Sequence, residues 1–355
     1  MRDLSACQSG WGREDTDGLA AVLDGAVTID GQTARRVAHE WLVHDPPQVV
    51  ETRAGRHVGN GMVVAIEQRT AELRRLDDHM GGGDLLGVVT AELGATVTLA
   101  REASYTEATG RRLFAGIGDL AQLAGWVASD AGDHQAAARY YLGGLQAAHA
   151  AADDALAANL LSLLSYQTAC QGDPREAILL ARTAYRGAPS SATPAVRALM
   201  GERVAWAYAT AGDADGCQRA LDEVDTVFGA TTDGEPDWAY WLNWDEIRIM
   251  AGRCYTELRR PMKAVPLLDA ALRVYDSGLS REVALYLTWL AESYIHAREI
   301  DQAADAVSRA LTVSTTVNSA RSRDRVSTVR TRLHPYKDAT SVKQFEEQYR
   351  ATMKR

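Results

Sequence analysis

The sequence is poor in cysteine, and its cysteines are not paired. Cys7, Cys170, Cys217 and Cys254 are spread over 355 residues. Zinc sites and disulfide frameworks use closely spaced cysteines, so this distribution predicts neither a structural metal nor a disulfide scaffold. Unpaired cysteines are typical of a reducing compartment. Because the first fifteen residues also lack the apolar core of a signal peptide, we expect a cytoplasmic protein.

Long apolar runs and a basic excess are missing as well. No stretch approaches the roughly 18 apolar residues that a membrane span needs, so we expect no membrane association. The net charge of −9 speaks against a general nucleic-acid-binding protein. Phenylalanine occurs only three times, whereas alanine and leucine are abundant. This composition favours helices that pack closely through small side chains.

Motifs of enzymes and metal sites are also absent. His39 and His44 are five residues apart, whereas two zinc ligands on one helical face need a spacing of four. The glycine-rich stretches 59–61 and 81–83 lack the strand–turn–helix setting of a dinucleotide loop, and there is neither a phosphate-binding loop nor a GxSxG motif. We therefore predict no catalytic residues, no cofactor and no metal.

The sequence does contain an internal repeat. Similar segments begin at Ala131, Gln171, Ala211 and Arg298, and a weaker copy begins at Arg259. In each segment a turn position is followed five places later by a small residue. These small residues are 40, 40, 47 and 39 positions apart: Ala137, Ala177, Cys217, Ala264 and Ala303. Such a period indicates stacked helix pairs rather than a globular domain.

The helix before each turn has a matching register. When the turn is counted as place fifteen, place eight is always small: Gly125, Ser165, Ala205, Gly252 and Ala291. Place eleven is tyrosine in three of the five copies: Tyr208, Tyr255 and Tyr294. A small residue at place eight lets the two helices of a pair approach closely. This register resembles that of tetratricopeptide repeats, although the period near 40 keeps HEAT repeats as an alternative.

The predicted fold is therefore all-α, a solenoid of tetratricopeptide-like helix pairs over residues 59–355. Residues 1–58 are predicted to be a divergent N-terminal segment with two short helices, in 15–26 and 30–45, and a linker rich in proline and glycine. Residues 318–355 carry ten Lys/Arg against four Asp/Glu. We expect this basic tail to cap the solenoid, with binding of an anionic partner as the alternative.

Candidate binding residues follow from the repeat register, because the first helix of each pair should line the concave groove. Place nine should point into the groove, next to the tight crossing, and neighbouring places should flank it. The three aromatic residues at place nine would form a ladder along the groove, unless they pack as core between repeats. Trp238, Trp241 and Trp244 have the spacing of one helix face and are expected to be core. The candidate groove residues are Trp126, Asp130, Asn159, Tyr166, Glu202, Trp206, Arg253, Glu292 and His296.

Three segments, 74–86, 107–141 and 197–213, resemble the repeat region of actinobacterial transcriptional regulators with an N-terminal Cro/CI-type helix-turn-helix. The resemblance implies a repeat region that senses a small molecule, a peptide or a protein partner and mediates oligomerisation, here as a homodimer. No recognisable helix-turn-helix precedes the repeats in this sequence. We therefore expect a non-catalytic sensor or adaptor in transcriptional regulation. The alternatives are a regulator that binds DNA directly through residues 1–58 and an enzyme built on the repeat scaffold.

Overall fold

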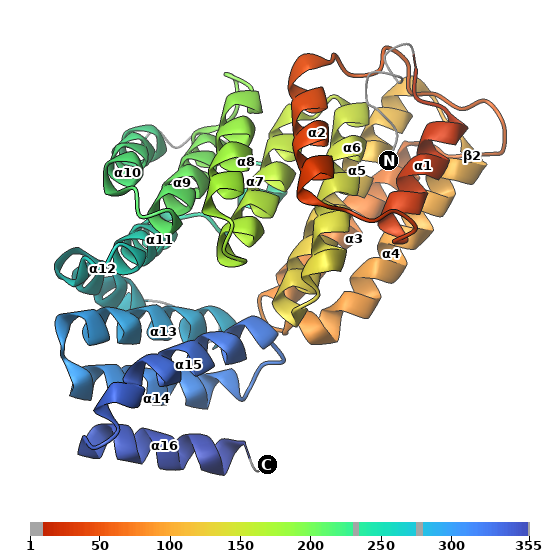
Figure 1. Cartoon of the computed structure of the whole chain (residues 1–355). Helices are drawn as coiled ribbons and strands as arrows, with labels where there is room; N and C mark the ends of the chain where they lie inside the picture. Colours follow the sequence, from red (N-terminus) through yellow and green to blue (C-terminus); the bar gives the residue numbers. More distant parts are fainter. Residues whose placement is uncertain (1–9, 230–233, 275–279, 354–355) are drawn as a thin grey trace.

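The computed structural model describes residues 10–229, 234–274 and 280–353 and shows an all-α protein (Figure 1). Sixteen α-helices account for most of the described residues. They are α1 (Arg13–Leu23), α2 (Gly31–Val43), α3 (Asn60–Asp77), α4 (Gly82–Glu102), α5 (Glu107–Ala131), α6 (His134–Ala151), α7 (Asp154–Cys170), α8 (Pro174–Gly187), α9 (Pro194–Thr210), α10 (Ala214–Phe228), α11 (Trp244–Glu257), α12 (Pro261–Val274), α13 (Ser280–Ala297), α14 (Ile300–Ser314), α15 (Ala320–Leu333) and α16 (Thr340–Thr352).

From α5 onward the helices pack as sequential pairs, and their turns explain the repeated Gly-Asp dipeptides. Gly132, Gly172 and Gly212 have positive φ angles of 91°, 90° and 75°, a conformation that costs glycine little. The aspartate that follows each glycine caps the next helix through its side chain. For example, Asp133 Oδ1 accepts a hydrogen bond from the Ala136 amide at 2.9 Å. The dipeptide therefore ends one helix and starts the next.

The small residues at place eight lie where the two helices of a pair cross, as predicted. A Cβ atom on Gly125 would lie 2.3 Å from the Tyr141 ring, and one on Gly252 would lie 2.8 Å from Leu268. Ser165 fits because its hydroxyl donates a hydrogen bond to the carbonyl of Ala177, at 2.8 Å. The repeat register read from the sequence is thus confirmed.

The N-terminal segment forms the two expected short helices and packs onto the repeats. Trp41 of α2 covers Gly187 of α8, where a Cβ atom would lie 2.0 Å from the indole. Its indole nitrogen donates to Asp154 Oδ1 at 3.1 Å. The linker adds a small parallel sheet of two-residue strands, β1 (Arg56–His57) and β2 (Ala103–Ser104). Buried residues of α1 and α2 therefore belong to the same hydrophobic cores as the repeat helices.

The three tryptophans expected on one helix face do not share a helix. Trp238 lies in the 3₁₀ helix η2 (Asp237–Ala239), Trp241 follows in a turn, and Trp244 begins α11. Asn243 interrupts the periodicity, because its side chain accepts hydrogen bonds from the amides of Asp245 and Glu246 and thereby starts a new helix. Only Trp238 is buried.

The C-terminal helices return to the first repeat helices and close the superhelix (Figure 1). Arg281 of α13 donates two hydrogen bonds of 2.9 Å to the carboxylate of Asp77 at the end of α3. Just before α15, Ser319 donates to Asp130 Oδ1 of α5 at 2.8 Å. The backbone of Asn318 lies so close to Gly81 that a Cβ atom there would be 2.2 Å from its carbonyl oxygen. The Gly81–Gly83 stretch therefore permits the closing contact.

One described helix, α4, is long and apolar enough to cross a membrane by length and composition, with a mean hydropathy of 1.3. This qualifies the expectation that no segment approaches a membrane span. The buried residues of α4 recur every four positions at Leu85, Val89, Leu93 and Val97, and the helix packs against α5. That one-sided burial is the pattern of a helix that covers a protein core.

Candidate functional site

The closed superhelix surrounds a cavity of about 760 Å³. Its lining comes mainly from the first helices of the pairs, namely α5, α7, α9, α11 and α13, with further residues from α3, α15 and the segment around η2. Among the described residues, α8, α10 and α14 contribute nothing to the lining. The cavity therefore lies in the predicted concave groove, which the closure of the chain covers in part.

Five of the nine candidate groove residues line this cavity: Trp126, Asn159, Tyr166, Trp206 and Arg253. Trp126 and Tyr166 are half-buried, whereas Trp206 is only 5% exposed. Trp206 thus both lines the cavity and belongs to the hydrophobic core, so the two interpretations of the aromatic ladder are not exclusive.

The other four candidates, Asp130, Glu202, Glu292 and His296, are not among the lining residues. Asp130 accepts hydrogen bonds from Ser319 and from the amide of Gly82, so it serves the closure of the chain. Glu292 is held by Arg325 and Arg332 of α15. The sequence placed these side chains on the groove, whereas Asp130 and Glu292 pair with arginines of α15 and His296 is half-buried at the end of α13.

Glu202 has a distinct environment behind the cavity wall. It is 1% exposed, and neither of its carboxylate oxygens has a hydrogen-bond partner among the described residues. Burial raises the pKa of Glu202 well above its ordinary value, which favours the neutral acid. Glu202 therefore supplies little negative charge to the arginines nearby.

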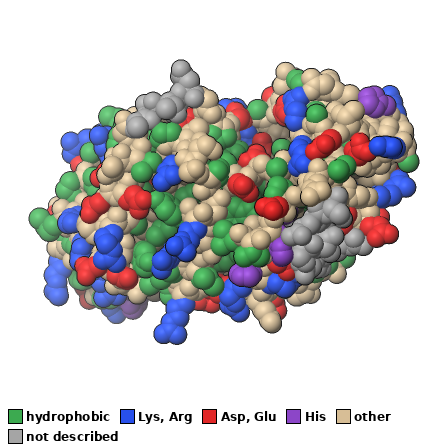
Figure 2. Space-filling view, turned by 90° about the horizontal axis from the view of Figure 1, so that it is seen from above, with side chains coloured by type: hydrophobic (Ala, Val, Ile, Leu, Met, Phe, Trp, Pro, Cys, Tyr) green, Lys and Arg blue, Asp and Glu red, His purple; other side chains and the backbone are tan. Residues whose placement is uncertain are grey.

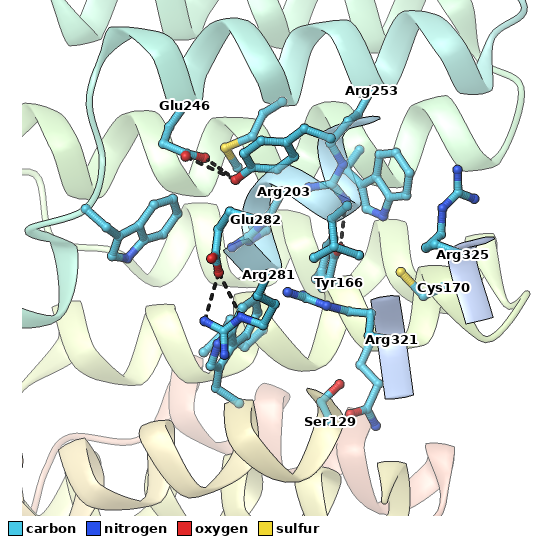
Figure 3. A pocket seen from close by; sticks show the side chains of 18 of the residues that line it. Ser129, Tyr166, Cys170, Arg203, Glu246, Arg253, Arg281, Glu282, Arg321 and Arg325 are labelled. Carbon is cyan, nitrogen blue, oxygen red and sulfur yellow. Dashed lines mark hydrogen bonds and ion pairs between the residues drawn. The ribbon is translucent and has the colours of Figure 1, made fainter. Parts of the chain in front are cut away.

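Aromatic rings and arginines form one connected cluster on the cavity wall (Figure 3). We use the name aromatic–arginine cluster for Tyr166, Trp206, Trp289, Arg203 and Arg253. Trp206 lies between the other two rings, with centroids 6.0 Å from Tyr166 and 5.4 Å from Trp289. The Arg253 guanidinium carbon lies within 5.4 Å of all three ring centroids.

The two arginines of this cluster have no carboxylate partner among the described residues. Arg203 is 5% exposed, lies 4.9 Å from the Tyr166 ring centroid, and makes no hydrogen bond within the described chain. Arg253 donates one hydrogen bond from Nη2 to the hydroxyl of Tyr166 at 2.6 Å, while its Nε has no partner. Burial and the neighbouring Arg253 lower the pKa of Arg203. The two cations are therefore close enough to repel each other.

Most acidic groups on the cavity wall are engaged elsewhere. Asp77 and Glu282 both pair with Arg281, with nearest distances of 2.9 and 2.8 Å. Glu246 accepts hydrogen bonds from the hydroxyl of Tyr286 at 2.8 and 3.0 Å, and Asp78 accepts from Tyr240. None of these four carboxylates forms an ion pair with Arg203 or Arg253 within the described residues.

Sequence reasoning missed place six of the repeats, which lines the cavity in all five copies: Leu123, Leu163, Arg203, Met250 and Trp289. Place six is three positions before place nine, so both lie on the same side of the helix. The appearance of Arg203 and Trp289 at this place was a readable signal. Arg321 and Arg325 of α15 were missed because no periodicity places a capping helix across the groove.

No group of three His, Cys, Asp or Glu side chains able to hold a metal ion occurs within the described residues. Cys170 lines the cavity with an exposed side chain, but partial desolvation by the surrounding wall raises the pKa of its thiol, which disfavours the nucleophilic thiolate. The chemistry that this wall does offer is cation–π contact, hydrogen bonding and apolar packing.

Comparison with known proteins assigns the chain to no family. No family model matches its sequence, and a search of curated proteins finds no match.

Proposed function

We propose that this protein is a non-catalytic sensor whose central cavity binds a small molecule or a short peptide. The observation that carries this proposal is the cavity itself, about 760 Å³ in volume and lined by the repeat helices. Ligand sites of drug-sized molecules typically measure about 300–1,000 Å³ and combine apolar walls with a few polar groups. Aromatic rings beside arginines provide that combination here.

The closure of the superhelix supports a role in signalling. Helices α3, α5, α13 and α15 all contribute to the cavity, although they lie far apart in the sequence. A ligand that contacts them together would stabilise the closed arrangement over any more open one, since it binds that arrangement better. The altered outer surface would then be read by a partner in transcriptional regulation, with this chain as the sensor or adaptor.

Direct DNA binding receives less support from the same observations. Two arginines of the basic C-terminal tail, Arg321 and Arg325, line the cavity. Two others, Arg330 and Arg332, pair with Glu346 and Glu292. On the face seen in Figure 2, acidic and basic side chains are interspersed. A duplex-binding face would instead gather basic residues.

Native mass spectrometry of the purified chain tests the proposal. We expect a co-purified mass that remains bound under gentle ionisation and leaves on unfolding. Five of the eight tryptophans line the cavity, so adding the recovered ligand to stripped protein should change the intrinsic fluorescence: Trp126, Trp206, Trp238, Trp241 and Trp289. Extracts that yield no bound mass and produce no fluorescence change would contradict the proposal.

A matched pair of substitutions locates the binding. Trp126→Ala removes a half-buried ring from the cavity wall, and we expect binding to weaken at least tenfold, because aromatic anchors typically contribute about 2 kcal/mol. Trp244→Ala removes an indole that is 42% exposed and does not line the cavity, so affinity should stay unchanged. Equal affinities of the two variants would place the ligand elsewhere.

A further inference from the structure

The positive charge of the aromatic–arginine cluster is the feature that indicates the chemistry of the ligand. Arg203 and Arg253 come from neighbouring repeats, line the same cavity and both approach Tyr166. Neither has a carboxylate within ion-pair distance in the described part of the chain. A buried cation without a counter-charge is costly, since burial removes water that the protein does not replace.

Cation–π contacts compensate only part of that cost. Each such contact is weaker than the cost of removing an ion from water. The rings also leave the planar donor forks unfilled: apart from the one hydrogen bond of Arg253 to Tyr166, neither guanidinium donates to any described residue. Guanidinium forks match the two oxygens of a carboxylate or the oxygens of a phosphate.

We propose that the ligand carries an oxyanion, a carboxylate or a phosphate, which Arg203 and Arg253 bind together. This proposal rests on the proposed function of the cavity and names the chemical class of its ligand. The apolar part of the ligand then packs against the adjoining rings of Trp206 and Trp289, which meet edge to face at 88°. A flat apolar group joined to an anionic group fits both halves of the wall.

Two arginines of α15 extend the same site from the opposite side. Arg321 lies 4.5 Å from the Trp126 ring centroid, and its Nε has no hydrogen-bond partner although Asp130 Oδ1 is 3.4 Å away. Arg325 lies 3.7 Å from the Trp289 ring centroid and pairs with Glu292 at 2.7 Å. Figure 3 shows Arg203, Arg253, Arg321 and Arg325 around one cavity. An anion held by Arg203 and Arg253 therefore also attracts α15.

The test uses four probes on the full chain at matched ionic strength: inorganic phosphate against chloride, and indole-3-acetate against its neutral isostere indole-3-acetamide. Melting temperature and tryptophan fluorescence are the two readouts. We expect a saturable rise in melting temperature with at least one oxyanion, beyond its neutral or chloride control, as linkage requires of a ligand that binds the folded state. Phosphate and indole-3-acetate distinguish a phosphate group from a carboxylate.

Three variants decide whether the response comes from this site. Arg203→Met and Arg253→Met remove the charge but keep most of the apolar stem. Each substitution should weaken binding of the oxyanion about tenfold or more, because a hydrogen bond to a charged group is lost. Arg248→Met removes an exposed arginine of the same helix as Arg253 and should keep the full response. Circular dichroism of each variant verifies its fold.

Other results overturn the assignment. If indole-3-acetamide binds as tightly as indole-3-acetate and phosphate acts no differently from chloride, the cavity binds ligands but not through an anion. If the oxyanion response persists in Arg203→Met and Arg253→Met, it arises elsewhere. If none of the four probes has any effect, the anion site is wrong, while the co-purified mass still decides the proposed function separately.

Discussion

Asp77 and Arg281 are 204 positions apart in the sequence, yet they form a buried pair with two hydrogen bonds of 2.9 Å. Their side chains are 6% and 3% exposed. The pair joins the end of α3 to the start of α13 and thereby fixes the diameter of the closed superhelix. Because the cavity lies inside this closure, its shape depends on contacts that are distant from its aromatic wall.

Breaking this pair should therefore destabilise the whole chain. Asp77→Ala leaves Arg281 buried with Glu282 at 2.8 Å, the Met80 carbonyl at 3.3 Å and Asp130 at 3.9 Å. Loss of one member of a buried pair typically costs about 3–5 kcal/mol. We expect a loss near the lower end of that range in urea denaturation. Asp269→Ala breaks the exposed pair with Arg273 and should cost less than about 1 kcal/mol. Equal effects would mean that the closure contributes nothing to stability.

Two glycines of α4 should respond in opposite directions to alanine. A Cβ atom on Gly82 would lie 2.4 Å from the Val127 carbonyl oxygen, so Gly82→Ala should cost about 1–3 kcal/mol through overpacking. A Cβ atom on Gly87 meets no atom within 4 Å. Gly87→Ala should therefore stabilise the helix by about 0.5–1 kcal/mol. Thermal melting of both variants tests this difference. If both substitutions shift the melting temperature in the same direction, the contact at Gly82 is contradicted.

The buried Glu202 should make the free energy of unfolding depend on pH. Burial raises the pKa of Glu202 in the folded state above its ordinary value of 4.5. At a pH between the ordinary pKa and the raised pKa, the unfolded chain has released a proton that the folded chain still holds. Rising pH in that window therefore favours unfolding. Glu202→Gln removes this dependence, and the variant should gain stability over the parent as pH rises from 4.5 to 8. Urea denaturation at pH 4.5 and at pH 8 measures the difference in free energy of unfolding between the variant and the parent. The exposed Glu347→Gln controls for net charge, and a constant difference would disprove the burial argument.

Trp206→Ala should weaken both folding and binding, since the indole belongs to the core and to the cavity wall. Removal of a buried tryptophan costs about 3–5 kcal/mol of stability. Affinity measured well below the lowered melting temperature should still fall about tenfold or more. A variant that melts like the parent would show that Trp206 is not core. One that binds like the parent would remove it from the site.

Much of the repeat architecture was predictable, because it depends on local rules. Gly125 and Ser165 recur at one place, and Gly132 with Asp133 marks a turn, wherever the neighbouring repeat lies. The groove positions Trp126, Tyr166 and Trp206 follow from the same register. Periodicity identified which helix face lines the cavity, although it did not reveal the environment of each side chain.

The rest depended on contacts between distant segments. No local pattern shows that Asn318 lies against Gly81, or that Arg325 of α15 covers Glu292. Asp130 and Glu292 were assigned to the groove because a repeat register assumes an open concave face. Once α15 crosses that face, the same positions become internal ion-pair partners. The environment of Glu202 could not be predicted from the sequence either, because its lack of hydrogen-bond partners depends on several helices at once.

The Gly81–Gly83 contact with Asn318 has a consequence for how this protein can change over time. An open array of repeats can gain or lose a unit with little effect on the units that remain. Here an added or deleted pair would carry Asn318 away from Gly81 and Gly83 and separate Arg281 from Asp77. The number of repeats is therefore fixed by geometry, and new ligand preferences can arise only by substitution along the wall.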